Sequence, residues 1–338
     1  MTIAQSGIHD PVSAEKAAPG RLPGTGEVLR LLGAGATGSI LLALGRGPLR
    51  TKELTKQVPG FAPRTIYRYA GKLADIGVVE REEEPGVPSK VVHRLTDPSG
   101  AELHRVVAAY AEASLERLPS GDVGVHSWGS LAMVADLWES GMVEELNLGP
   151  RTATELARGQ RFLSYHQVSR RAVLFETGGL IAEWPGAGRR RRYELTANAR
   201  RAMALVAGIA RWRRHHEVEA GEAELSPAET ACLLRTTLPL LRLPGHGGKT
   251  LGIEVLSADG ERGEFEPVTA TVGADGTLVV SEMSGSAQGW GSGQPVAWLD
   301  TLVDGTPGLL QIGGDSALVE DCVAGLHRTL WKSPAPGD

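Results

Sequence analysis

GPLRTKEL (47–54) and GPRTATEL (149–156) decide the organisation of this chain. When the sequence is shifted by 102 residues, four of the eight letters in these two stretches coincide. The match continues without a gap as far as Gly77, which falls on Gly179. A repeat of this length indicates a duplicated domain rather than the short unit of a solenoid.

The two copies predict the same order of elements. A first helix is expected at 27–44 in copy one and at 130–146 in copy two. A short second helix is expected at 50–58 and at 152–160. A third helix and a β-hairpin complete each copy, and the hairpin returns through VVHRLT in copy one and RRYELT in copy two. This order is that of a winged helix-turn-helix.

The third helix of each copy has an apolar stripe and a polar face. It begins with Pro63 in copy one and after Ser164, a plausible N-cap, in copy two. The stripe consists of Ile66, Ala70 and Leu73, matched by Val168, Ala172 and Phe175. The polar positions are the candidate DNA-reading residues: Arg64, Thr65, Tyr67 and Arg68 in copy one, and Tyr165, His166, Gln167, Ser169, Arg170 and Arg171 in copy two.

LLGAGATGSI (31–40) contains a Gly-x-Gly-x-x-Gly spacing, which also occurs in dinucleotide-binding turns. A buried strand should precede such a turn, but 27–32 has helical apolar spacing. The glycines are therefore expected to serve helix packing or a helix junction.

With these motifs, both copies resemble the HxlR/MarR-type winged-helix transcription regulators, over about 27–216. The family pattern is GP-x-R-x-x-EL, a recognition helix, LxxxGLIxR and a wing that ends in LT. Trp138 matches the tryptophan of the family, whereas Ala36 replaces it in copy one. The resemblance implies binding of double-stranded promoter DNA, with no cofactor.

Charge is distributed unevenly along the chain. Residues 149–216 contain 14 arginines and 4 acidic residues, whereas 217–338 contain 6 basic and 18 acidic residues. The basic segment favours a polyanion-binding surface. Four consecutive arginines, expected at the tip and return strand of the second wing, are further candidate DNA contacts: Arg189, Arg190, Arg191 and Arg192. The alternatives are a solvated loop or pairing with Glu176 or Glu183.

Copy one is the weaker candidate reader, because its wing, REEEPGVPSK (81–90), carries three glutamates that would repel phosphate. Lys90 and Arg94 could still contact DNA, or copy one could position copy two or bind a protein. The amphipathic segments 101–118 and 199–218 lie where the family dimerises. They are expected to form an intramolecular pseudo-dimer or a homodimer, and the stripe could equally be ordinary core.

The C-terminal third predicts a separate α+β domain. A helix is expected at 225–243, strands at 248–257, 265–273 and 276–283, and then a glycine-serine loop, SGSAQGWGSG. Two helices follow, VAWLDTLVDG and ALVEDCVAGLHRTLW, around a short strand, LLQIGG. VAWLDTLVDG followed by LQIGGDSALV resembles the sterol-carrier-like domain of some actinobacterial regulators. That resemblance implies an apolar cavity, which could be lined by Phe265, Met283, Trp290, Trp298 and Trp331, although each is more often ordinary core.

The fold class is therefore α+β: two tandem winged helix-turn-helix domains followed by an α+β sterol-carrier-like domain. The expected divisions are a disordered tail (1–25), winged helix one (26–118), a linker (119–128), winged helix two (129–218) and the ligand-binding domain (225–332). The histidines and the two cysteines show no catalytic or metal-ligand spacing, so no enzyme activity is expected. The chain has no run of about 18 apolar residues, so no membrane span is expected. Its first 20 residues lack an apolar signal core and its two cysteines fit a reducing compartment, so a cytoplasmic protein is expected.

These expectations combine into a sequence-specific transcriptional regulator that a small lipophilic effector modulates. The acidic third could also dock on the basic DNA-facing surface and inhibit binding. One rival is a protein that sequesters a small molecule or confers resistance, without sequence-specific DNA binding. A methyltransferase-like enzyme is disfavoured because no second glycine-rich strand–turn–helix follows residue 217.

Overall fold

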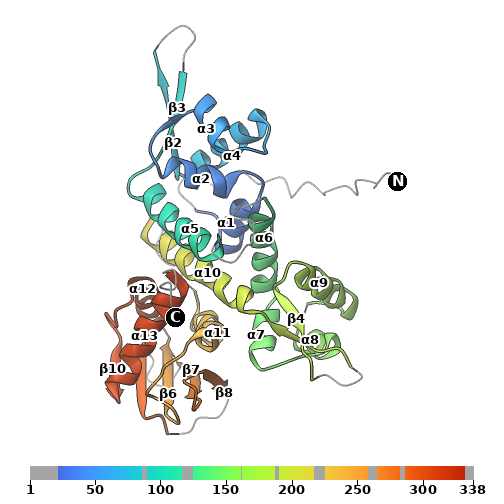
Figure 1. The fold of residues 1–338 in the computed structure, drawn as a ribbon, viewed down its shortest axis with the longest axis vertical. Helices are drawn as coiled ribbons and strands as arrows, with labels where there is room; N and C mark the ends of the chain where they lie inside the picture. The colour runs from blue at the N-terminus through green and yellow to red at the C-terminus, as the bar shows by residue number, and fades with distance from the viewer. Residues whose placement is uncertain are drawn as a thin grey trace.

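The structure is a computed structural model that describes residues 22–85, 90–115, 125–160, 162–186, 190–216, 225–257, 265–281 and 286–331. Three bodies meet around one long central helix (Figure 1). Among the described residues no single helix is long and apolar enough to cross a membrane. The first two helices satisfy that test only as a pair, which is bent by 87°.

The first body consists of five helices and a three-stranded sheet in the order β1-β3-β2. Its elements are α1 (Thr25–Gly33), α2 (Thr37–Leu44), β1 (Leu49–Arg50), α3 (Thr51–Gln57), α4 (Pro63–Asp75), β2 (Val79–Glu84), β3 (Lys90–Leu95) and α5 (Ser99–Leu115). The single helix expected at 27–44 is wrong. It is broken at Gly35, whose left-handed φ of 59° takes the chain from α1 into α2.

The second body repeats this order around a two-stranded hairpin. Its elements are α6 (Val125–Glu139), α7 (Met142–Asn147), α8 (Ala153–Gly159), α9 (Tyr165–Thr177), β4 (Ile181–Glu183), β5 (Tyr193–Leu195) and α10 (Ala197–His216). The helix expected at 130–146 is also broken, at Gly141, which has a φ of 68°. Because α6 begins at Val125, the expected linker 119–128 is partly helical.

The two bodies correspond in detail. The bounds of α3 and α4, shifted by 102 residues, are those of α8 and α9. Gly77 and Gly179 both end the third helix with a left-handed φ, of 72° and 69°. The hydroxyl of Thr96 donates to the carbonyl of Gly77 at 2.6 Å, and Thr196 donates to Gly179 at 2.7 Å. The repeat in sequence is thus a repeat in hydrogen bonding as well.

The two bodies are joined helix against helix. α1 packs along α6, and α5 packs along α10. A Cβ atom on Gly33 would lie 2.9 Å from the backbone of α6, and one on Gly38 would lie 2.6 Å from the indole of Trp128. The glycines of 31–40 therefore permit close helix packing, as predicted.

The third body contains one five-stranded sheet in the order β10-β9-β6-β7-β8, in which only β6 and β9 run parallel. Its elements are α11 (Pro227–Thr237), a 3₁₀ turn η1 (Leu238–Leu240), β6 (Thr250–Leu256), β7 (Phe265–Val272), β8 (Leu278–Ser281), β9 (Gly289–Gly293), α12 (Pro295–Asp304), β10 (Gln311–Gly314) and α13 (Ser316–Trp331). The glycine-serine loop expected at 284–293 is wrong, because its second half forms β9. Gly291 leaves room there for Trp298 of α12, since a Cβ would approach that ring to 3.0 Å.

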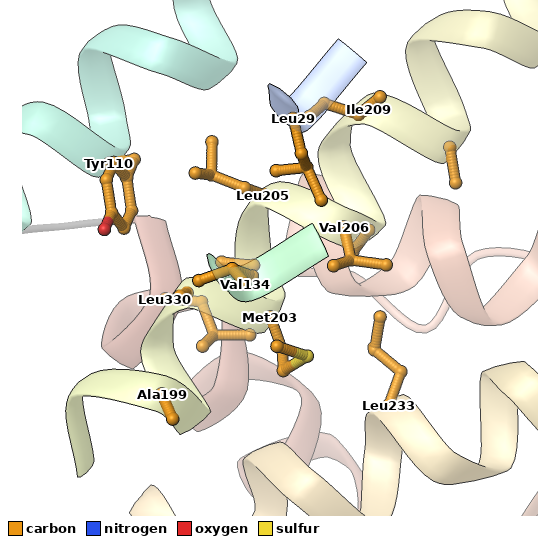
Figure 2. Close-up of a cluster of buried hydrophobic side chains, with 14 of the residues drawn as sticks. Leu29, Tyr110, Val134, Ala199, Met203, Leu205, Val206, Ile209, Leu233 and Leu330 are labelled. Carbon is orange, nitrogen blue, oxygen red and sulfur yellow. The ribbon is translucent and has the colours of Figure 1, made fainter. Parts of the chain in front are cut away.

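Helix α10 lies in the core shared by all three bodies. Figure 2 shows Leu205, Val206 and Ile209 of α10 among side chains from α1, α5, α6, α11 and α13. The three side chains of α10 are buried completely. The hydrophobic driving force of this shared core holds the three bodies together.

Candidate nucleic-acid interface

Helix α4 presents a basic face to solvent. Pro63 occupies its first turn, and the buried positions Ile66, Ala70 and Leu73 fix it on the first body. The opposite side exposes Arg64, Arg68 and Lys72. These three cations and Arg81, which joins them from β2, are called here the first basic face.

Two tyrosines hold part of this face in place. Arg81 donates to the Tyr67 hydroxyl at 2.6 Å and stacks 4.7 Å from the ring centroid. Arg68 and Lys72 lie 4.9 and 5.4 Å from the centroid of the Tyr69 ring. Such cation–π contacts leave the charge available while restricting the side chain. Tyr67 itself remains 48% exposed.

The acidic wing of copy one is largely neutralised by its own arginines. Arg94 forms ion pairs of 2.9 Å with Glu80 and with Glu82. Arg50 pairs with Glu84, also at 2.9 Å. The wing therefore repels phosphate less than its sequence indicates, and Arg94 is engaged rather than available for DNA.

Helix α9 begins with Ser164, the N-cap that the sequence predicted, and its cap also engages Gln167, a predicted DNA contact. The backbone N–H of Ser164 donates to the Gln167 side chain at 2.8 Å, and the Gln167 N–H donates to the Ser164 hydroxyl. This capping box engages the Gln167 carboxamide oxygen. His166 and Arg170 are exposed, whereas Arg171 is half-buried, and neither arginine has a polar protein partner in the described part of the chain.

Two arginines of the second wing are held by hydrogen bonds and ion pairs to other groups of the protein. Arg191 donates to Glu183 at 2.8 Å and to Glu176 at 2.5 Å, as the pairing alternative expected. Arg192 donates to the carbonyl of Pro150 at 3.0 Å and to Glu155 at 3.2 Å. Arg190 is exposed with no polar partner within the ranges described, and Arg189 lies outside the described residues. The run of four arginines therefore does not present four available charges.

Glu155 accounts for the position of Arg192. The backbone N–H of Thr152 donates to its carboxylate at 2.7 Å, and this lowers the pKa of Glu155. The charge of Arg192 acts in the same direction but less strongly. Arg192 thus anchors the wing to the N-terminus of α8.

Helix α9 and the segment before it also expose apolar side chains that the sequence did not predict. Val173 and Leu174 on α9 are about half exposed, at 51% and 50%. Phe162, before α9, is 93% exposed. The matching positions in copy one are Gly71 and Lys72, and this comparison within the repeat could have revealed the difference.

Much of the basic segment points away from α9. Five of its arginines lie on α10, and Arg213 is only 8% exposed. Arg211 donates to Asp300 at 2.9 Å and to Asp304 at 3.1 Å, both on α12. The ion pairs between the basic segment and the acidic third are thus made at α10. The docking of the acidic third on the DNA-facing helices, expected as a means of inhibition, is not what these contacts show.

The expected ligand residues do not all share one cavity. Phe265 and Trp290 are partly exposed on one face of the sheet, at 44% and 38%. Trp298 belongs to α12 on the other face, where it is buried against the sheet, and its indole N–H donates to the Glu254 carbonyl at 3.2 Å. Trp331 packs against Gly208 of α10. Trp298 and Trp331 thus belong to helices, α12 and α13, whereas Phe265 and Trp290 belong to strands β7 and β9. Met283 lies outside the described residues.

Comparison with known proteins finds a match over the first body. Residues 31–119 match the family described as HxlR-like helix-turn-helix. This part of the chain is therefore similar in sequence to HxlR-like helix-turn-helix domains. An uncharacterized HTH-type transcriptional regulator of Halalkalibacterium halodurans, BH0655, is 40% identical over 53 residues. These are 16% of this chain and 47% of the relative, so the chain spans about half the length of the curated relative it matches.

Solved structures give a similar partial match. The diamide-treated YodB of B. subtilis is 31% identical, with 25% of this chain and 87% of that chain covered and a TM-score of 0.23. The reduced form of the transcriptional regulator YodB is 29% identical, with 28% and 93% covered and a TM-score of 0.25.

Proposed function

We propose that this protein is a sequence-specific DNA-binding transcriptional regulator whose two winged helices form a pseudo-dimer within one chain. The observation that carries the proposal is the pairing of α1 with α6 and of α5 with α10. Regulators with a helix-turn-helix place two recognition helices on successive turns of DNA by dimerising. A chain that pairs two such bodies internally supplies both helices itself.

In this proposal the HxlR-like domain is the stronger reader. Its α4 exposes the first basic face, in which Arg64 and Arg68 lie toward the N-terminal half of the helix that contacts base edges in such domains. Arginine is the side chain best suited to guanine in the major groove. The second helix, α9, contributes His166 and Arg170 beside exposed Val173 and Leu174. Apolar groups at such positions contact thymine methyls.

We assign the C-terminal body the role of effector domain, related in fold to sterol-carrier-like domains. Its helices contact α10 and α5, the same helices that join the two winged helices. A ligand that binds one arrangement of these bodies better than another shifts the population toward that arrangement. Effector binding would thereby change DNA affinity without covering α4 or α9.

The test is DNA binding by the full chain to the region upstream of its own gene, against a scrambled duplex of the same length. Fluorescence anisotropy is measured at about 50 and about 200 mM salt, because phosphate contacts make affinity fall steeply over that range. Arg68→Ala and Arg170→Ala are compared with Arg328→Ala, an exposed arginine on α13.

We expect specific binding that Arg68→Ala weakens about 5- to 150-fold, corresponding to the loss of roughly 1–3 kcal/mol for a base contact. A smaller loss is expected for Arg170→Ala, and none for Arg328→Ala. Equal binding to both duplexes would overturn the proposal. It would leave the small-molecule-sequestering protein as the better account.

A further inference from the structure

The C-terminal sheet has one face covered by helices and one open face. Leu251, Ile253 and Val255 of β6 are buried toward the helices, so Gly252 and Glu254 between them face the open side. The register β6–β7 places Phe265, Pro267 and Thr269 on the same side, and the register β6–β9 adds Trp290. The residues that the sequence suggested for an apolar ligand, Phe265 and Trp290, thus belong to this open face.

A hollow of about 350 Å³ lies on the open face. Its floor is formed by Gly252 and Thr269, which are direct cross-strand partners. Ala287 lies over Gly252, and a Cβ on Gly252 would come within 2.9 Å of the Ala287 Cβ. Glycine is therefore the residue that fits here. Trp290 and Phe265 both line the hollow. The indole of Trp290 lies against Gly313 of β10, where a Cβ would come within 2.4 Å of the ring.

Glu254 stands between the two aromatic residues. It is two residues from Gly252, the partner of Trp290, and two residues from Leu256, the partner of Phe265. Diagonal neighbours of this kind lie about 7–8 Å apart, within reach of aromatic side chains. No hydrogen bond or ion pair engages the Glu254 side chain in the described part of the protein, and only its backbone carbonyl is used, by Trp298. Arg235 approaches the neighbouring strand, where it donates to the Pro267 carbonyl at 2.6 Å and pairs with Glu266.

We propose that this hollow binds a lipophilic organic cation, such as a quaternary or protonated amine attached to an apolar group. Aromatic faces attract cations through the ring quadrupole, and an unpaired carboxylate beside them supplies the opposite charge. The surrounding segment 217–338 contains 18 acidic and 6 basic residues, a field that favours cations and repels anions. A fatty acid or other anionic lipid is therefore a poor ligand for this face.

The regulatory meaning of this site rests on the function proposed above, whereas the binding itself does not. The probe is benzyltrimethylammonium, and benzenesulfonate serves as an aromatic ion of similar size and opposite charge. Isothermal titration calorimetry of the full chain measures both at one ionic strength. Glu254→Gln removes the charge while retaining the shape and the backbone carbonyl that Trp298 uses. Glu320→Gln, at an exposed position of α13, is the matched control with the same change in net charge.

We expect benzyltrimethylammonium to bind and benzenesulfonate not to bind. Glu254→Gln is expected to weaken the cation about tenfold, equivalent to 1.4 kcal/mol. Phe265→Leu, at an exposed position that tolerates an aliphatic group, is expected to weaken it about 2- to 5-fold as cation–π contact is lost. Glu320→Gln is expected to have no effect. Similar affinity for the two probes, or an unchanged affinity in Glu254→Gln, would overturn the proposal.

The same protein preparation separates the two proposals. If the cation binds with these variant effects but DNA binding is non-specific, the ligand site stands and the regulator does not. If DNA binding is specific but the cation does not bind, the regulator stands and the assignment of this ligand class fails.

Discussion

One added methyl group at Gly33 tests the packing of α1 against α6, on which the proposed pseudo-dimer rests. It ends α1 where that helix crosses α6. A Cβ there would lie 2.9 Å from the amide nitrogen of Ala132 and 2.9 Å from the carbonyl oxygen of Trp128. Both atoms belong to the backbone of α6, so a side-chain rotation cannot relieve the contact. Gly33→Ala must move one helix relative to the other.

The magnitude follows from two opposing effects. Overpacking of a well-packed core costs typically about 1–3 kcal/mol. Replacing a helical glycine by alanine stabilises the fold by about 0.5–1 kcal/mol, because alanine lowers the conformational entropy of the unfolded chain. The net expectation is a loss of roughly 1–2 kcal/mol in the free energy of unfolding. Gly129→Ala, on α6 with open space around its Cβ position, is the matched control and is expected to be neutral or stabilising.

Urea unfolding followed by tryptophan fluorescence measures both variants, because Trp128 is buried at this contact. Gly33→Ala should also weaken specific DNA binding, although Gly33 is far in sequence from α4 and α9. If Gly33→Ala is as stable as Gly129→Ala and binds DNA normally, the close approach of α1 to α6 is refuted, and with it the basis for the pseudo-dimer.

Three further expectations follow from buried polar groups. Burial lowers the pKa of His93, in β3, and that of His104, in α5. Both imidazoles therefore contribute stability above their unfolded pKa that is lost as the pH falls, so the free energy of unfolding should drop as the pH is lowered from about 7.5 to about 5.5. The drop should be smaller in His93→Gln. Burial raises the pKa of Cys232 and Cys322 to about 12, so iodoacetamide at about pH 8 should label them only in denaturant, and rapid labelling of the native chain would contradict the buried positions. Glu102 lies within 3.0 Å of His215 and 2.9 Å of His216, so Glu102→Gln should cost about 1–3 kcal/mol in urea unfolding, whereas Glu112→Gln, exposed on the same helix, should cost little.

The repeat made the third helix of each copy, α4 and α9, predictable from sequence. The stripes Ile66/Ala70/Leu73 and Val168/Ala172/Phe175 fix which side of α4 and α9 is buried, and all six are buried. The breaks at Gly35 and Gly141 were missed because a glycine within a helical pattern does not reveal the sign of its φ. Strand β9 was missed for a related reason. Its glycines are required by the approach of Trp298, Asp315 and Leu310, which only the tertiary structure supplies.

Charge was the least predictable part of the site. Counting arginines treats every guanidinium as available, whereas Arg191 and Arg192 are held by carboxylates on α8, α9 and β4. Arg200, on α10, donates to the Thr236 carbonyl, and burial lowers its pKa. For the wing of copy one, the sequence overestimated the available negative charge, because Arg94 and Arg50 form ion pairs with its glutamates. Net charge along a sequence thus says little about which charges face a ligand.

The proposed regulator joins two different readers in one chain, which has a consequence for stoichiometry and for the operator. A dimeric regulator must associate before or during binding, whereas here the second reader is present at the effective concentration set by the shared core. We expect one chain per operator, measured by native mass spectrometry, and a hyperbolic isotherm. Because Gly71 and Lys72 of one reader correspond to Val173 and Leu174 of the other, the two half-sites should differ. An operator with either half duplicated as a palindrome should then bind more weakly, by about 1–3 kcal/mol for each mismatched base pair. A complex of two chains per operator that prefers the palindrome would show instead that α5 and α10 serve a homodimer, and that only one of the two winged helices reads DNA.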